Sequence, residues 1–230
     1  MTTIGNRLQD ILATIQSAAL ASAAKQQVQL LAVSKAQPAA AIREAYAAGQ
    51  TAFGENYSQE ALEKQSQLAD LAIEWHFIGP IQSNKTQIIG QNFSWVHSVD
   101  RLKIAQRLND ARSSMQTPLN VCIQMNVSNE ETKSGVSPDQ LEAIATAIQT
   151  LPNLTLRGLM AIPAPTVDPS QQIAQFKQVR ECYDALINKG FTLDTLSIGM
   201  SDDYQTAIGQ GATIVRIGSA LFGARAKNKP

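Results

Sequence analysis

Residues 28–49 read VQLLAVSKAQPAAAIREAYAAG, and this stretch decides the fold. The apolar run at 28–33 has the length of a buried strand and carries a β-branched valine at each end. Pro38 is placed to open a helix that closes at Gly49, in the position of a C-cap. The intervening turn, SKAQP, contains no glycine. An open doubly wound sheet usually carries a glycine-rich turn at this point, so the stretch favours a barrel.

The same strand–helix unit recurs along the rest of the chain. Further strands are predicted at 51–53, 74–78, 95–99, 119–127, 154–162, 193–198 and 213–217. Helical patterns lie between them, which predicts parallel βαβ units with right-handed crossovers, and eight strands is the number that closes a barrel. We therefore predict an α/β fold with a single (β/α)8 TIM barrel, an extra N-terminal helix within 1–24 and a frayed tail at 224–230. An open doubly wound sheet is the alternative.

Composition excludes several classes of protein. The 230 residues contain 19 Lys and Arg against 19 Asp and Glu, which argues against binding nucleic acid or an anionic membrane through bulk charge. No apolar run is long enough to span a bilayer, and the first residues lack the pattern of a signal peptide. Cys122 and Cys182 lie far apart, and two histidines are too few for a conventional zinc site. We expect one cytoplasmic domain over residues 1–230, with no room for a second.

Single polar groups follow the predicted strands, and carboxylates are scarce there. In a barrel the site lies at the carboxyl ends of the strands. Glu55 is the only acid at such a position, so the paired carboxylates of a glycosidase and a cluster of metal-binding acids are missing. Lys35 directly follows an apolar strand, where desolvation lowers the pKa of an amine and frees it as a nucleophile toward carbonyls. A lysine that reaches the rim as a solvated charge is the alternative.

Three further candidates follow predicted strands, and two lie within them. Arg216 interrupts the apolar strand TIVRIG, so its guanidinium needs either a ligand or a structural pair. Gly218 and Ser219 follow that strand and offer an N–H and a hydroxyl to a phosphate. Ser201, in GMSDD, either contacts a phosphate or caps the next helix. His76, in EWHFIG, is either a core histidine or a site residue.

Seven stretches, taken together and in order, match a known pattern. They are LLAVSK (30–35), FGENYSQE (53–60), WHFIGPIQSNK (75–85), ETKSGVSP (131–138), GLMAIP (158–163), LSIGMSDDYQTAI (196–208) and VRIGSALFG (215–223). The chain resembles the YggS/PROSC family of pyridoxal phosphate (PLP) homeostasis proteins. Ile81 stands where leucine is common in that family, and Ile198 where methionine is common. Both differences exchange one apolar residue for another and leave the chemistry untouched.

The resemblance implies a barrel of the alanine racemase N-terminal-domain type, PLP fold type III, and a set of cofactor-binding residues. Lys35 would hold PLP as an internal aldimine, while Ser201, Gly218 and Ser219 would contact the phosphate. Arg216 would face the pyridine nitrogen. The remaining residues implied to line the cofactor's ring are Asn56, His76 and Met200. Because a guanidinium donates and keeps its proton, the pyridine nitrogen facing it would be an unprotonated acceptor and a weaker electron sink.

The implied function is that of a binding protein. Racemases of this type use a second base, a tyrosine from another domain and subunit, for which we expect no room in this chain. We therefore expect a PLP carrier or buffer in vitamin B6 homeostasis, with effects on amino-acid metabolism, rather than an enzyme. PLP-dependent apoenzymes are the expected partners, and the chain is expected to be a monomer. The alternatives are a minimal amino-acid racemase that uses Lys35 and a barrel aldolase that forms Schiff bases with its substrate.

Overall fold

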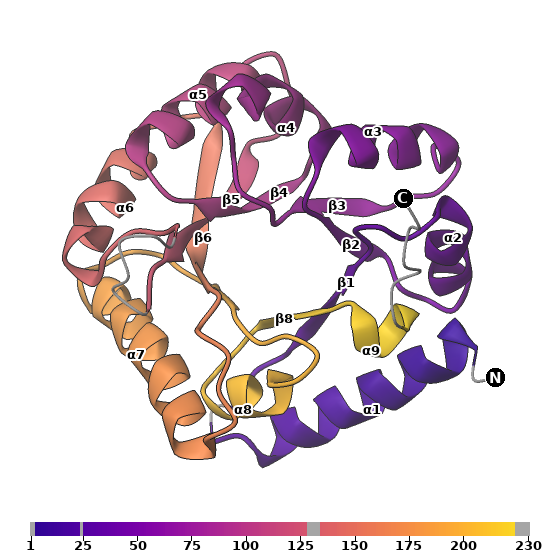
Figure 1. Ribbon diagram of the computed structural model, residues 1–230. Coiled ribbons are helices and arrows are strands. Elements are labelled where there is room, and N and C mark those ends of the chain that lie inside the picture. Colours follow the sequence, from indigo (N-terminus) through magenta and orange to yellow (C-terminus); the bar gives the residue numbers. More distant parts are fainter. Residues whose placement is uncertain (1–2, 24, 128–133, 224–230) are drawn as a thin grey trace.

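The protein is a closed barrel of eight parallel strands (Figure 1), which confirms the predicted fold and excludes the open sheet. The computed structural model describes residues 3–23, 25–127 and 134–223. Each strand pairs with the next one in the sequence, and β8 pairs with β1, so the first and last strands lie side by side. The strands are β1 (Gln29–Val33), β2 (Ala52–Glu55), β3 (Glu74–Phe77), β4 (Trp95–Val99), β5 (Leu119–Met125), β6 (Leu154–Ala161), β7 (Thr195–Ser197) and β8 (Ile214–Ile217).

Helices surround the barrel on its outer side (Figure 1). They cover the outward-facing strand residues, which form the main hydrophobic core together with the inner faces of the helices. The helices that follow strands are α2 (Ala39–Ala47), α3 (Ser58–Gln67), α4 (Thr86–Asn92), α5 (Leu102–Arg112), α6 (Leu141–Gln149), α7 (Pro169–Asn188), α8 (Tyr204–Gly209) and α9 (Ser219–Phe222). Two 3-10 turns, η1 (Ser83–Lys85) and η2 (Pro138–Gln140), precede α4 and α6.

The predicted N-terminal helix is α1 (Ile4–Ala21). It packs against α2, α8 and α9, and so covers the barrel where β8 meets β1 (Figure 1). The Arg7 Nε donates to the Leu221 carbonyl at 2.6 Å, which joins α1 to α9. Since α9 has only four residues, α1 supplies the apolar cover that a full helix after β8 would provide. Residues 1–2, 24 and 224–230, which include the predicted tail, lie outside the described residues.

One glycine in β6 is required by the close approach of the next strand. The register between β5 and β6 shifts next to Gly158, whose φ is +157°. A Cβ atom at this position would lie 1.7 Å from the Thr195 carbonyl oxygen of β7. No side chain fits there, so this point of the barrel depends on glycine.

The interior of the barrel is divided between apolar and polar side chains. One apolar cluster comprises Leu31, Ala52, Ile78 and Ile214, and another comprises Trp95, Cys122 and Met160. The buried polar residues of β3, β4, β7 and β8 are His76, His97, Ser98, Thr195, Ser197 and Arg216. A barrel of this kind is ordinarily filled by branched apolar residues, so this polar half calls for a functional explanation.

Candidate functional site

A cavity of about 220 Å³ opens at the carboxyl ends of the strands. It lies where the site of a barrel protein is expected. Every predicted site residue except His76 lines it. The lining residues are Val33, Lys35, Asn56, Ile78, Ile162, Met200, Ser201, Asp202, Arg216, Gly218 and Ser219. The closure of the barrel by β1 and β8 is what brings Lys35 next to Gly218 and Ser219.

The turn that carries Lys35 is held by hydrogen bonds on both sides of that residue. The buried Ser34 hydroxyl donates to Glu55 Oε1 at 2.7 Å, and the Ser34 carbonyl accepts from Lys64 Nζ at 2.7 Å. On the other side, the Ala36 N–H donates to Glu60 Oε1 at 2.6 Å. Ala36 has a φ of 58°, a left-handed conformation that costs energy for a residue with a Cβ. The turn is thus fixed in one shape, with the half-buried Lys35 at its centre.

A cluster of charged side chains, formed by Glu55, Glu60 and Lys64, packs against this turn and hydrogen-bonds to it. Lys64 Nζ lies 2.7 Å from Glu55 Oε1 and 2.6 Å from Glu60 Oε1. The Glu55 side chain is fully buried, and burial raises its pKa, while hydrogen bonds from Lys64 and Ser34 act in the opposite direction. The sequence marks Glu55 as the only acid at a strand end but does not by that position reveal its partners. The sequence feature that could have indicated these partners is the Glu60–Lys64 pair, whose members are four residues apart and therefore on one helix face.

Small and hydroxylic residues line the side of the cavity formed by β7 and β8. Ser201 Oγ accepts a hydrogen bond from the Ala220 N–H at 3.4 Å, so the loops after the two strands meet there. The alternative role of Ser201 as a helix cap is not what the structure shows, because α8 begins at Tyr204 with Asp203 as its N-cap residue. A Cβ at Gly218 would lie 3.2 Å from the Val33 carbonyl oxygen, so a side chain there would press on β1 beside the cavity.

Arg216 is buried and has both structural partners and free donors. Its Nη1 donates to the carbonyl and the hydroxyl of Ser197, at 2.5 and 2.9 Å, and its Nη2 donates to the Ala161 carbonyl at 2.9 Å. A guanidinium has five N–H groups. These bonds to described residues leave the Nε–H and one Nη2–H for a ligand in the cavity. Burial lowers the pKa of Arg216 to about 10, so the group remains a cation at neutral pH.

The structure places His76 below the cavity, so its predicted contact with the cofactor is not supported by the geometry. Its ring is fully buried and contacts Glu74 and His97, with nitrogen–oxygen and nitrogen–nitrogen distances of 2.8 and 2.9 Å. The reason is the two-residue period of a strand: Ile78, two residues later on the same face, reaches the cavity instead.

The groups around the cavity fit pyridoxal phosphate. One cavity wall carries an amine on Lys35, another carries the spare donors of Arg216, and a third carries hydroxyls and a glycine. Asn56 adds a buried side-chain oxygen, Oδ1, that has no hydrogen-bond partner among the described residues. A buried polar atom without a partner is costly, and a ligand with a hydroxyl group can satisfy it. An aldehyde, a ring nitrogen, a ring hydroxyl and a phosphate therefore each have a complementary group.

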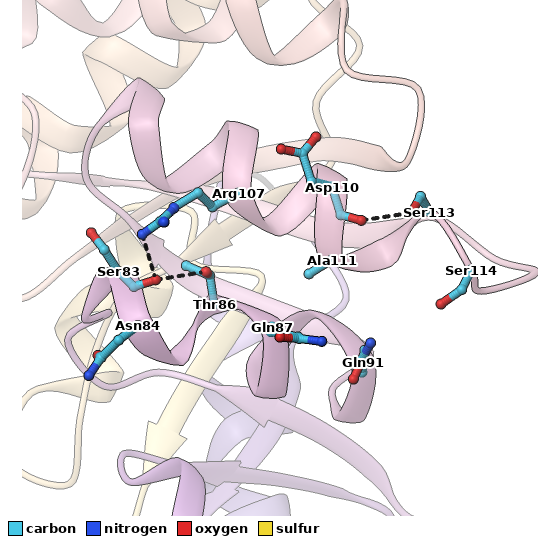
Figure 2. Close-up of a pocket in the computed structure, with 10 residues that line it drawn as sticks. All are labelled: Ser83, Asn84, Thr86, Gln87, Gln91, Arg107, Asp110, Ala111, Ser113 and Ser114. Carbon is cyan, nitrogen blue, oxygen red and sulfur yellow. Dashed lines mark hydrogen bonds between the residues drawn. The ribbon is translucent and has the colours of Figure 1, made fainter.

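A second hollow, of about 540 Å³, lies outside the barrel between η1, α4 and α5 (Figure 2). Three of its polar side chains are bound to backbone carbonyls. Arg107 and Thr86 both donate to the Ser83 carbonyl, at 3.0 and 2.9 Å, and Ser113 donates to the Asp110 carbonyl (Figure 2). Because this hollow is lined by residues of helices and turns and by none that ends a strand, we favour the barrel cavity as the site.

Residues 3–23, 25–127 and 134–223 offer neither a metal-binding cluster nor a membrane-spanning helix. In this part of the chain no three His, Cys, Asp or Glu side chains gather in a way that could hold a metal ion. None of its helices combines the length and the apolar character needed to cross a membrane.

The fold and the cavity define a class of protein, the barrel of the alanine racemase type. The profile of the family described as "Alanine racemase, N-terminal domain" matches residues 9–226. The chain is also 58% identical over 231 residues to the pyridoxal phosphate homeostasis protein of Pseudomonas aeruginosa, an alignment that covers 100% of this chain and 99% of that protein. The chain belongs to this family of pyridoxal phosphate homeostasis proteins.

Solved structures agree with this assignment. PipY of Synechococcus elongatus, solved with PLP bound, has a TM-score of 0.87 and 38% identity, covering 96% of this chain and 100% of that one. Alanine racemase from Corynebacterium glutamicum has a TM-score of 0.70 at 19% identity, covering 99% of this chain and 62% of the enzyme. The second comparison shows a shared fold alone.

Proposed function

We propose that this chain binds pyridoxal phosphate at Lys35 and serves as a carrier or buffer in the homeostasis of this cofactor. The observation that carries the proposal is the cavity itself, which gathers Lys35, Arg216, Ser201 and Ser219 from the ends of β1, β7 and β8. The name of the Pseudomonas aeruginosa relative and the PLP-bound structure of PipY support it.

The residues of the cavity have separate tasks in this proposal. Lys35 would hold the cofactor through its amine, which can condense with the aldehyde of PLP and release water. Ser201, Ser219 and the backbone of Gly218 hold the phosphate. Arg216 donates to the pyridine nitrogen, which therefore stays unprotonated. The cofactor supplies an electron sink when it is bound, and an unprotonated ring is a weak one.

The ring itself lies between smaller contacts. Asn56 Oδ1, which lacks a partner among the described residues, accepts a hydrogen bond from the cofactor, and Met200 packs against the ring. Both contacts orient the aldehyde toward Lys35.

The position of the tyrosines favours binding over racemisation. A racemase needs a second base on the opposite side of the cofactor, and none of the four tyrosines of the chain is among the described residues that line the cavity. Tyr57 is exposed at the start of α3, and Tyr183 is buried on α7, where burial raises its pKa to about 12. We therefore propose a monomeric cytoplasmic carrier that passes PLP to apoenzymes and has no robust racemase activity.

Reduction with borohydride followed by mass spectrometry tests the proposal. Purified protein mixed with PLP should acquire a pyridoxyl group on Lys35. Lys35→Ala should lose this adduct, and Lys177→Ala, which removes an exposed amine from α7, should keep it. An adduct on exposed lysines alone, or none at all, would overturn the proposal. Lys35-dependent conversion of L-amino acids to D-isomers would replace the carrier with the racemase.

A further inference from the structure

A column of polar side chains crosses the interior of the barrel beneath the cavity. It begins at Glu74, whose side chain is 43% exposed at the amino-terminal end of β3. It continues through three fully buried residues, His76, His97 and Ser197, and ends at Arg216, which lines the cavity. The column therefore joins strands β3, β4, β7 and β8, of which β4 and β7 are not neighbours in the sheet.

Each step of the column is a hydrogen bond of ordinary length. Glu74 Oε1 and His76 Nε2 are 2.8 Å apart, and His76 Nδ1 and His97 Nε2 are 2.9 Å apart. His97 Nδ1 lies 2.8 Å from the Ser197 hydroxyl, which in turn accepts from Arg216 Nη1 at 2.9 Å. Buried polar groups that are fully paired in this way hold one another in a single arrangement.

The direction of these bonds follows from counting protons. Arg216 can only donate, so Ser197 Oγ accepts from it and uses its own O–H toward His97 Nδ1. His97 then donates from Nε2 to His76 Nδ1, and His76 donates from Nε2 to the carboxylate of Glu74. Each hydroxyl or imidazole proton in the column has an acceptor when both imidazoles are neutral.

An added proton disturbs this order. If His76 carried two protons, its Nδ1–H would point at His97 Nε2, and His97 would turn its own proton toward Ser197 Oγ. That oxygen would then accept from two N–H groups, and its O–H would lose its acceptor. A change at the histidine pair is thus passed to the residue that holds Arg216 Nη1.

The surroundings favour the neutral arrangement. Burial lowers the pKa of His76 and lowers that of His97 well below its ordinary value. A hydrogen bond from His76 holds the pKa of Glu74 below its usual range, so the column has an anion at one end and a cation at the other. Trp95 stacks on the His76 ring at 5.4 Å and 6°, which fixes the plane of that imidazole.

We propose that His76, His97 and Ser197 are positioning residues that orient the guanidinium of Arg216 toward the ring nitrogen of the bound cofactor. Because that ligand belongs to the proposed function, this role rests on it. The apolar filling usual in a barrel interior would leave Nη1 of Arg216 with only the Ser197 carbonyl to hold it. The polar column adds a second, directional acceptor that is itself fixed from the opposite side of the barrel.

The column can be tested first without any cofactor. The chain contains only two histidines, so histidine labelled with ¹⁵N gives two side-chain spectra, which His76→Gln assigns. At neutral pH both rings should be neutral and protonated on Nε2. A charged ring, or a His97 protonated on Nδ1, would overturn the proposal, because the bond to Ser197 would then run the other way.

The link to Arg216 is tested by binding two ligands, PLP and its deaza analogue, in which a C–H replaces the ring nitrogen. The wild type should prefer PLP, and Ser197→Ala should bind PLP roughly tenfold more weakly while its affinity for the analogue changes little. Ser197→Thr, which restores the hydroxyl, should regain the preference. Thr195→Val, which removes a buried hydroxyl lower on the same strand, should keep it.

The outcomes separate this proposal from the proposed function. An equal loss of both ligands in Ser197→Ala would show a merely structural role and overturn the positioning proposal. A wild type that binds neither ligand would overturn the proposed function, and the histidine spectra would still decide whether the column exists.

Discussion

Replacing Lys64 by methionine keeps a long side chain in place and removes the charge from the cluster behind the Lys35 turn. The Lys64 side chain is 7% exposed and the Glu55 side chain is fully buried, so the variant leaves a buried carboxylate without its cation. Breaking a buried pair by removing one partner costs about 3–5 kcal/mol of unfolding free energy. For a chain of this size, that loss corresponds to a Tm about 6–20 °C lower.

The assay is thermal unfolding followed by circular dichroism. Arg43→Met is the matched control, because it also breaks an ion pair between a basic side chain and a carboxylate. That pair is exposed on the surface, so its loss should change Tm little. The double variant Lys64→Met with Glu55→Gln should recover much of the Tm, because it removes the unpaired charge.

The pH dependence of the Lys64→Met variant has a definite sign. An acid whose pKa is raised on folding binds more protons when folded, so its carboxylate destabilises the protein as the pH rises above the ordinary value of 4.5. The difference in Tm between the wild type and Lys64→Met should therefore be largest at neutral pH and shrink toward acid pH. If Lys64→Met lowered Tm no more than Arg43→Met does, the reasoning about the buried cluster would be refuted.

Three further results are expected. Gly158→Ala should not give stable protein, as judged by soluble yield and circular dichroism, because its Cβ would fall 1.7 Å from a carbonyl oxygen of β7; a stable variant would contradict the close approach. His76 and His97 have lowered pKa values, so unfolding takes up protons and stability should fall as the pH drops below about 6.5, by at most about 1.4 kcal/mol per pH unit for each histidine. Urea titrations at several pH values measure this, and His97→Gln should flatten the slope. Iodoacetamide should label the half-buried Cys182 before the fully buried Cys122, whose pKa burial raises to about 12; equal rates would argue against that burial.

The barrel was predictable from the sequence because its signals are local. The alternation of apolar runs with helical patterns identifies the eight strands, and the turn at 34–38 separates the barrel from an open sheet. The helix α9 was missed, since the four residues Ser219–Phe222 are too few to show a period.

The site was predictable where a polar residue follows a strand or, for Arg216, interrupts an apolar one. Lys35, Ser201 and Ser219 follow β1, β7 and β8, and they line one cavity. The contact of His97 with Ser197 joins two strands that are not adjacent, and no periodicity or spacing reports which interior residues meet across a barrel. The same limit applies to His76: the motif WHFIG does not show which residue of the strand faces the cavity, and in the structure Ile78 lines it.

The pairing of β8 with β1 has a consequence for how the protein is made. A ribosome produces Lys35 before Ser219, and residues 36–219 must be added before the two sides of the cavity can meet. Until β8 emerges, β1 is also an unpaired edge, open to pairing with other chains. Translation must therefore proceed past β8 before the cavity can form, because β8 both closes the sheet against β1 and carries one side of the cavity.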